Sequence, residues 1–136
     1  GAQDALQWDP EYHRDWQTSE LYYAMKEAVD NGVFSLTDYM DGNIDSPETY
    51  RLISKEYLYL LNFGMWEYGQ EFWENGTLAP EWNDNARTPT GVKENNPLGY
   101  ALFNQYIKPV LSKPRLSDLR SIFQDNDGGI SGYVSD

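Results

Sequence analysis

The fold is decided by residues 46–76, which read SPETYRLISKEYLYLLNFGMWEYGQEFWENG. The stretch opens with Ser46 as an N-cap and Pro47 at the first helical position, and it closes on Gly76, a common helix stop. Between them, apolar residues recur every three or four positions, as they do on one face of an α-helix. We therefore predict a long central helix over about residues 46–75, with a stripe formed by Tyr50, Ile53, Tyr57, Leu60 or Leu61, Gly64, Tyr68 and Phe72.

Shorter helices are predicted on both sides of the central one. A first helix over residues 9–31 would begin with Asp9 as its N-cap and end before Gly32. Pro97 marks the start of another helix, because proline is favoured at the first helical position. Residues 83–95 show no apolar periodicity and are predicted to be a loop.

Together these elements predict an all-α fold, an irregular four- or five-helix bundle that forms a single domain over residues 1–136. A last helix is expected after Pro114, and residues 1–8 and 128–136 are expected to be frayed ends. A chain of 136 residues buries roughly two thirds of its unfolded surface, so it needs no metal or disulfide to fold. The expected core comprises Tyr50, Ile53, Tyr57, Leu60, Leu61, Tyr68, Leu102, Phe103, Leu119 and Ile122.

The charge of the chain limits its partners. The net charge is −12, and residues 1–85 carry 17 acidic but only 4 basic side chains. Such a surface repels nucleic acid and anionic lipid, so neither is an expected partner, whereas a protein partner remains possible. No apolar run approaches the ~18 residues that span a bilayer, so direct membrane insertion of this segment is not expected. The sequence contains no cysteine, which excludes disulfides and thiolate chemistry.

The N-terminus bears on location. The chain begins Gly1-Ala2 and not with methionine, as it would after removal of a signal peptide or an anchor. We therefore expect an exported or membrane-anchored protein of which this is the soluble part. An arbitrary chain boundary in a cytoplasmic protein is the alternative.

One stretch near the C-terminus resembles a calcium loop. Asp125 and Asp127, followed by a glycine, match two ligand positions and the turn of an EF-hand. However, Phe123 stands at the first ligand position and Val134 at the position of the bidentate acid. A helix end followed by a glycine turn is therefore favoured, and no metal or other cofactor is expected.

Three carboxylates, Glu67, Glu71 and Glu74, lie one turn apart and so share one face of the predicted central helix. Two inward carboxylates could act as an acid and a base in a hydrolase. The single histidine, His13, has no nucleophile at a recognisable spacing and is expected to pair with Asp9. The glutamates are therefore interpreted as a solvated face, and no catalytic residue is predicted.

Aromatic side chains are the other candidates for binding, because tryptophan and tyrosine are enriched at interfaces. They comprise Trp8, Tyr12, Trp16, Trp66, Trp73 and Trp82, and the alternative is that these rings build the core. The predicted interaction surface combines the acidic face with three of the tryptophans: Glu67, Glu71, Glu74, Trp66, Trp73 and Trp82.

Residues 56–82 resemble a pattern in small bacterial helical proteins of unknown function, in which an acidic, aromatic helix turns at a glycine-hydrophobic step and a second helix begins at a tryptophan. Here Gly76, Leu78 and Trp82 occupy that step. Several of those proteins are membrane-anchored, so the resemblance implies helix packing and an upstream anchor but no catalytic residue.

These observations predict a non-enzymatic binding or interaction domain. One alternative is an acidic cytoplasmic inhibitor of the immunity-protein type, whose negative surface binds a basic partner. A second alternative is a carboxylate-based hydrolase.

Overall fold

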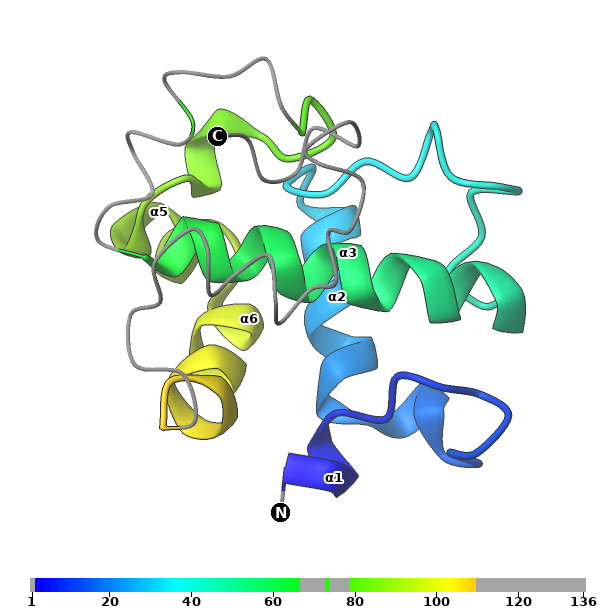
Figure 1. Cartoon of the computed structure of the whole chain (residues 1–136). Helices are drawn as coiled ribbons and strands as arrows, with labels where there is room; N and C mark the ends of the chain where they lie inside the picture. The colour runs from blue at the N-terminus through cyan, green and yellow to red at the C-terminus, as the bar shows by residue number, and fades with distance from the viewer. Residues whose placement is uncertain (1, 67–72, 74–78, 110–136) are drawn as a thin grey trace, which may run out of the picture.

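The computed structural model describes residues 2–66, 73 and 79–109 of the chain (Figure 1). Within these residues the structure is helical and contains no β-strand, only one isolated antiparallel bridge between Phe34 and Trp82. The predicted all-α fold is therefore confirmed. The α-helices are α1 (Ala2–Ala5), α2 (Glu20–Asp30), α3 (Pro47–Met65), α5 (Pro89–Asn95) and α6 (Pro97–Leu102); 3-10 turns cover Trp16–Thr18 and Asp84–Ala86, and a π-helical turn covers Phe103–Ile107.

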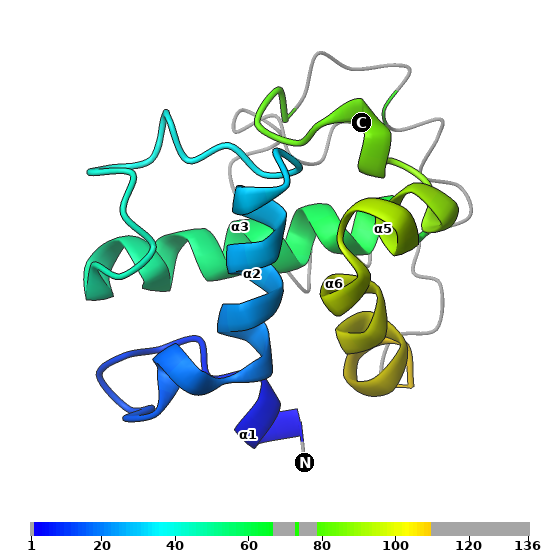
Figure 2. The same ribbon diagram turned by 180° about the vertical axis from the view of Figure 1, so that it is seen from behind.

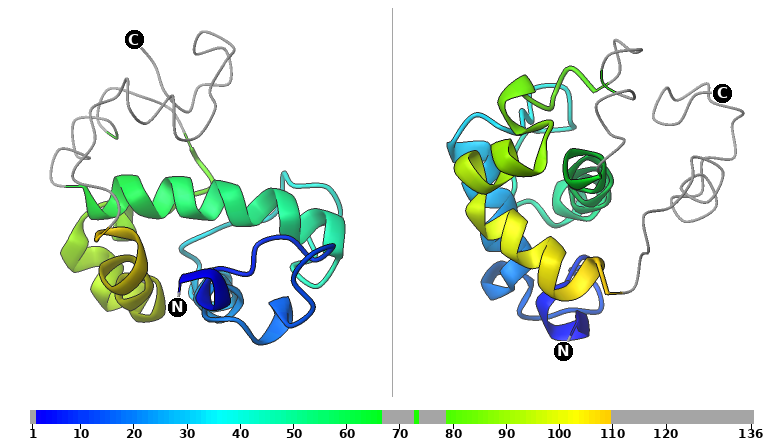
Figure 3. Two further views of the ribbon diagram at one scale, coloured as in Figure 1. Left: turned by 60° about the horizontal axis from the view of Figure 1, so that its bottom comes forward. Right: turned by 90° about the vertical axis from the view of Figure 1, so that its left-hand side faces the viewer.

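Helix α3 is the longest described element, and α2 crosses it (Figures 1 and 2). The right-hand view of Figure 3 looks nearly along α3 and shows α2, α5 and α6 on the same side of it. Helix α3 begins at Pro47, as predicted. None of the described helices is long and apolar enough to cross a bilayer.

The predicted end of α3 near residue 75 is wrong, because the helix ends at Met65 and the backbone of Trp66 is extended, with φ −81° and ψ 131°. Tertiary packing overrides the helical periodicity here. The backbone oxygen of Ala86 lies 2.7 Å from where a Cβ on Gly64 would be. The 3-10 turn Asp84–Ala86 therefore packs closely against the last turn of α3. The ring centroids of Phe63 and Trp66 lie 5.6 Å apart at this end of the helix.

The predicted first helix over residues 9–31 is also wrong in its first half. Residues 9–15 form turns in which the Asp9 carboxylate accepts a hydrogen bond from the Glu11 N–H at 3.0 Å. The α-helix starts only after Ser19, whose hydroxyl oxygen accepts from the Tyr22 N–H at 3.1 Å and so caps α2. The predicted stop is confirmed, since α2 ends at Asp30 and Gly32 has a φ of +73°.

Residues 83–95 are not the predicted loop, because they contain the 3-10 turn Asp84–Ala86 and helix α5. Thr88 caps α5 by accepting from the Gly91 N–H at 3.0 Å. At seven residues the helix is too short for an apolar period to be visible in the sequence. The predicted start of α6 at Pro97 is confirmed.

The two ends of the chain were expected to be frayed. The N-terminal end differs from this expectation, since Ala2–Ala5 form α1 and Ala5 is buried. Residues 128–136 and the expected helix after Pro114 lie outside the described residues.

The core is built largely from aromatic rings. Tyr57 on α3 contacts Phe34 and Trp82 with ring centroids 6.0 and 5.9 Å away, and Trp16 contacts Tyr50 at 4.4 Å. Among the residues expected in the core, those that the structure describes are all buried: Tyr50, Ile53, Tyr57, Leu60, Leu61, Leu102 and Phe103. Tyr68, Leu119 and Ile122 lie outside the described residues.

A buried polar cluster joins α2, α3 and α6, and we call it the Asn96 node. The Tyr57 hydroxyl donates to Asn96 Oδ1 at 2.6 Å, and Asn96 Nδ2 donates to the Ala24 carbonyl at 3.0 Å and to Glu27 Oε1 at 2.8 Å. Asn96 and Tyr57 are fully buried. Burial, reinforced by the Glu27 carboxylate, raises the pKa of the Tyr57 phenol well above its ordinary value of 10.0.

Candidate functional site

The structure buries two of the three tryptophans of the predicted interaction surface. Trp82 is fully buried and Trp73 is buried, so neither indole is available to a partner at the surface, while Trp66 is half-buried. The Trp82 indole N–H donates to the Ala86 carbonyl at 2.9 Å, which satisfies its one polar group within the core. The other members, Glu67, Glu71 and Glu74, lie outside the described residues, as do the calcium candidates Asp125 and Asp127.

An acidic turn between α2 and α3 has a structural role. One oxygen of Asp41 accepts from the Thr49 hydroxyl at 2.6 Å and from the Asn43 N–H at 3.0 Å. These hydrogen bonds, first that from Thr49, lower the pKa of the Asp41 carboxyl below its ordinary value. The turn is therefore held by its own side chains, with Thr49 fixing it to α3.

The next acid along the chain, Asp45, ties this turn to α2. One oxygen of Asp45 accepts from the Tyr22 hydroxyl at 2.7 Å and from Gln17 Nε2 at 3.1 Å. The Tyr22 contact is the largest cause that lowers the pKa of the Asp45 carboxyl. Burial and then this same bond raise the pKa of Tyr22 to about 12.

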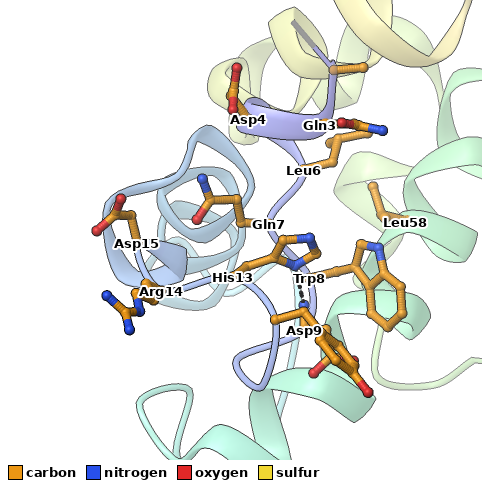
Figure 4. A pocket seen from close by; sticks show the side chains of 12 residues that line it. Gln3, Asp4, Leu6, Gln7, Trp8, Asp9, His13, Arg14, Asp15 and Leu58 are labelled. Carbon is orange, nitrogen blue, oxygen red and sulfur yellow. Dashed lines mark hydrogen bonds between the residues drawn. The ribbon is translucent and has the colours of Figure 1, made fainter.

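An open concavity lies between the N-terminal segment and α3, and we call it the N-terminal groove (Figure 4). It has a volume of about 900 Å³. In Figure 4, His13 lies near its centre beside Trp8, with Asp4 at one end and Asp15 on one side. Its lining comes from Ala2, Gln3, Asp4, Leu6, Gln7, Trp8, Asp9, Tyr12, His13, Arg14, Asp15 and Leu58.

Two hydrogen bonds from α3 hold the floor of the N-terminal groove in place. The Tyr50 hydroxyl donates to the Gln7 carbonyl at 2.9 Å. The Ser54 hydroxyl shares its one proton between the Trp8 carbonyl at 3.3 Å and the Arg51 carbonyl of its own helix at 3.1 Å. Burial raises the pKa of Tyr50, so this phenol stays protonated as a donor. Because these donors lie one turn apart on α3, they fix the segment along the helix.

His13 is held in one orientation within the N-terminal groove. Its Nδ1 accepts a hydrogen bond from the Asp9 N–H at 3.0 Å (Figure 4). Its own backbone N–H donates to the Asp9 carbonyl at 2.8 Å. The predicted pairing of His13 with Asp9 is therefore made through the backbone of Asp9. A neutral imidazole with Nδ1 as acceptor carries its proton on Nε2, which lies on the far side of the ring from Asp9.

Two aromatic rings of the N-terminal groove are exposed. Trp8 is 37% exposed and Tyr12 is 75% exposed. The Lys55 ammonium lies 5.0 Å from the centroid of the Trp8 ring, within the range of a cation–π contact. His13 approaches the same indole edge-on, with centroids 6.0 Å apart.

A smaller groove of about 310 Å³ adjoins the first, and Asp9 lines both. Its other lining residues include Glu11, Glu48 and Arg51. Arg51 lies 3.9 Å from the Glu11 carboxylate, and both side chains are largely exposed, so this ion pair contributes little stability.

Within residues 2–66, 73 and 79–109 no group of three or more histidine, aspartate or glutamate side chains is arranged to hold a metal ion. His13 lies beside the Trp8 indole and the Asp9 backbone amide. Among the described residues that line the groove, no hydroxyl group forms a hydrogen bond with its imidazole. What this groove offers chemically is a set of exposed rings, carboxylates and one oriented N–H donor. These are the elements of a binding site.

Comparisons of the chain with models of known protein families, with curated proteins and with solved structures found no match. The resemblance of residues 56–82 to small bacterial helical proteins therefore stays a prediction.

Proposed function

We propose that this chain is a binding domain that contacts a partner protein through the N-terminal groove. The observation that carries the proposal is the exposure of Trp8 and Tyr12 in one groove, in a fold that otherwise places most of its described rings in the core. Tryptophan and tyrosine dominate the binding energy of protein interfaces, because they bury a large area while losing few rotamers.

The positioning of the groove supports the same conclusion. Its floor is fixed to α3 by the Tyr50 and Ser54 hydroxyls, and its central imidazole is fixed by the Asp9 amide. A surface whose backbone is held before the partner arrives loses less conformational entropy on binding. An interaction domain gains affinity from this arrangement.

Site-specific photo-crosslinking in the protein's own host tests the proposal. A benzophenone amino acid replaces Tyr12, which is 75% exposed and lines the N-terminal groove. The matched control replaces Tyr23, which is 48% exposed on α2 and does not line it. We expect one discrete adduct, of the same partner each time, from position 12 and not from position 23. Equal adducts from both positions, or none from position 12, would refute the proposal.

Export or anchoring of the protein is a separate proposal. It predicts that the domain fractionates outside the cytoplasm of its host, either free or with the membrane. Recovery of the native protein only in the cytoplasmic fraction would favour the alternative of an acidic cytoplasmic inhibitor.

A further inference from the structure

The charges around the N-terminal groove point to the chemistry of what it binds. The groove and the smaller one that shares Asp9 are lined by five carboxylates and by two guanidinium groups, one of which is already paired with Glu11. Carboxylates that face one open surface repel anions and attract cations, most strongly at low salt. The lining acids are Asp4, Glu11, Asp15 and Glu48, which are exposed, and Asp9, which is buried. With the Lys55 ammonium beside Trp8 counted along with the two guanidinium groups, the five carboxylates outnumber the three cations by two.

The Trp8 ring shows a second, independent preference for positive charge. Its π-face already has a cation near it, the Lys55 ammonium at 5.0 Å from the ring centroid. Lys55 extends from α3, and its side chain is exposed, so it can leave the ring without breaking a buried contact. Lys55 therefore weakens the binding of a second cation at Trp8, because it occupies the ring face or repels the incoming charge.

The imidazole of His13 supplies a donor next to this ring. Since Nδ1 is occupied by the Asp9 N–H, the neutral ring offers Nε2–H, which suits a backbone carbonyl of an extended segment. A peptide carries such carbonyls at every residue, so one segment can place a cation near Trp8 and a carbonyl near His13, whose rings are 6.0 Å apart.

We propose that the N-terminal groove binds a basic segment of the partner protein, with a lysine or arginine head group at Trp8 and the surrounding carboxylates as its counter-charges. This inference rests on the proposed function and gives it a substrate class. Charge complementarity selects this occupant over an acidic segment or over a second copy of this chain, whose own net charge is −12.

Two short peptides test the proposal in solution: acetyl-Lys-Gly-Lys-amide and its acidic counterpart acetyl-Glu-Gly-Glu-amide. The full chain is titrated at low salt while the indole N–H resonance of Trp8 is followed by NMR. We expect saturable shifts of that resonance with the lysine peptide and not with the glutamate peptide. Saturable shifts with the glutamate peptide, or shifts on raising the protein concentration alone, would assign the groove to an acidic partner or to self-association and overturn the proposal.

A pair of lysine variants separates the local effect from the net charge. K55Q removes the cation beside Trp8, whereas K26Q removes a cation that lies on α2 and pairs with Asp30 at 3.6 Å. Both variants lose one positive charge. We expect K55Q to bind the lysine peptide about 2- to 5-fold more tightly than K26Q, the size of one exposed cation–π contact. Equal affinities of the two variants would overturn the role of the Trp8 ring.

A pair of aspartate variants locates the acidic contribution. D15N changes a carboxylate that lines the groove, and D38N changes an exposed carboxylate outside it. We expect D15N to weaken binding about 2- to 3-fold relative to D38N. Equal affinities would show that only the net charge acts and would refute the site.

The failures of the two proposals are distinguishable. A groove-specific adduct from position 12 together with no binding of the lysine peptide would leave the proposed function standing and remove the cationic ligand.

Discussion

Replacing Asn96 with alanine removes a fully buried amide that makes three hydrogen bonds, two to α2 and one to α3. The Tyr57 hydroxyl loses its acceptor and stays buried, and Glu27 keeps only the N–H of Leu98, at 2.9 Å, as a donor. The Ala24 carbonyl loses the side-chain donor as well. Gly99 fits the node closely, since a Cβ there would collide with the Asn96 amide and the Tyr57 hydroxyl.

The magnitude follows from these losses. A buried hydroxyl left without a partner costs about 1–3 kcal/mol, and each of the other two bonds contributes about 0.5–1.5 kcal/mol net. We expect N96A to lower the free energy of unfolding by about 2–6 kcal/mol, a large part of the ~5–15 kcal/mol that small domains possess. The melting temperature should fall by about 10 °C.

Urea unfolding followed by circular dichroism measures this change, with Y57F as the second variant of a double-mutant cycle. In the native background, Y57F strands the Asn96 oxygen and should cost about 1–3 kcal/mol. In the N96A background it removes a hydroxyl that has no partner, so it should cost almost nothing. We expect a coupling energy of about 1–3 kcal/mol. Additive effects of the two changes, or a loss below about 0.5 kcal/mol for N96A, would refute the reasoning.

Gly64→Ala should cost about 1–3 kcal/mol in urea unfolding, because its Cβ would lie 2.7 Å from the Ala86 carbonyl oxygen; an unchanged midpoint would contradict the close crossing. Ser19→Ala removes the cap of α2 and should cost about 1 kcal/mol, read from the same transition. The lowered pKa of the Asp45 carboxyl means that its contribution to stability is present above its ordinary value of 3.8 and is lost as the pH falls below it. The Tyr22 phenol has a pKa raised from 10.0 to about 12, so its contribution is present below pH 10 and is lost as the pH rises toward 12. Y22F should weaken both dependences in unfolding curves taken across the pH range, and identical profiles would show that this pair does not control them.

The sequence predicted the helical class and much of the core, because both follow from local periodicity. A cap signal was enough to predict the start of α3 at Pro47. A spacing of three to four residues between apolar positions was enough to predict the burial of Tyr50 and Tyr57. The end of α3 was not predictable in this way. The stripe continues past Met65 in the sequence, whereas in the structure the helix ends there, next to the close approach of the Ala86 carbonyl to Gly64.

The candidate site was predicted less well than the fold. Trp8 and Tyr12 were among the aromatic candidates, but the preferred surface included Trp82, which the structure buries against Phe34 and Tyr57. Exposed and buried tryptophans have the same local sequence signal, since burial depends on contacts between distant segments. The N-terminal groove exists because residues 6–9 fold back on α3, and no short-range pattern in the sequence indicates that contact.

The Asn96 node has a consequence for how the protein is made. Tyr57 and Asn96 are 39 residues apart, and Ala24 and Asn96 are 72 apart, so the node closes only when the C-terminal partner has been synthesised. Ribosomes add about 5–20 residues per second, which leaves an interval of about 2–8 s between Tyr57 and Asn96. During that interval α2 and α3 exist without α6, and the side of α3 that carries Tyr57 has no Asn96 to cover it. We therefore expect the Tyr57 ring to be accessible to chaperones and to other nascent chains until Trp82 and Asn96 have been added.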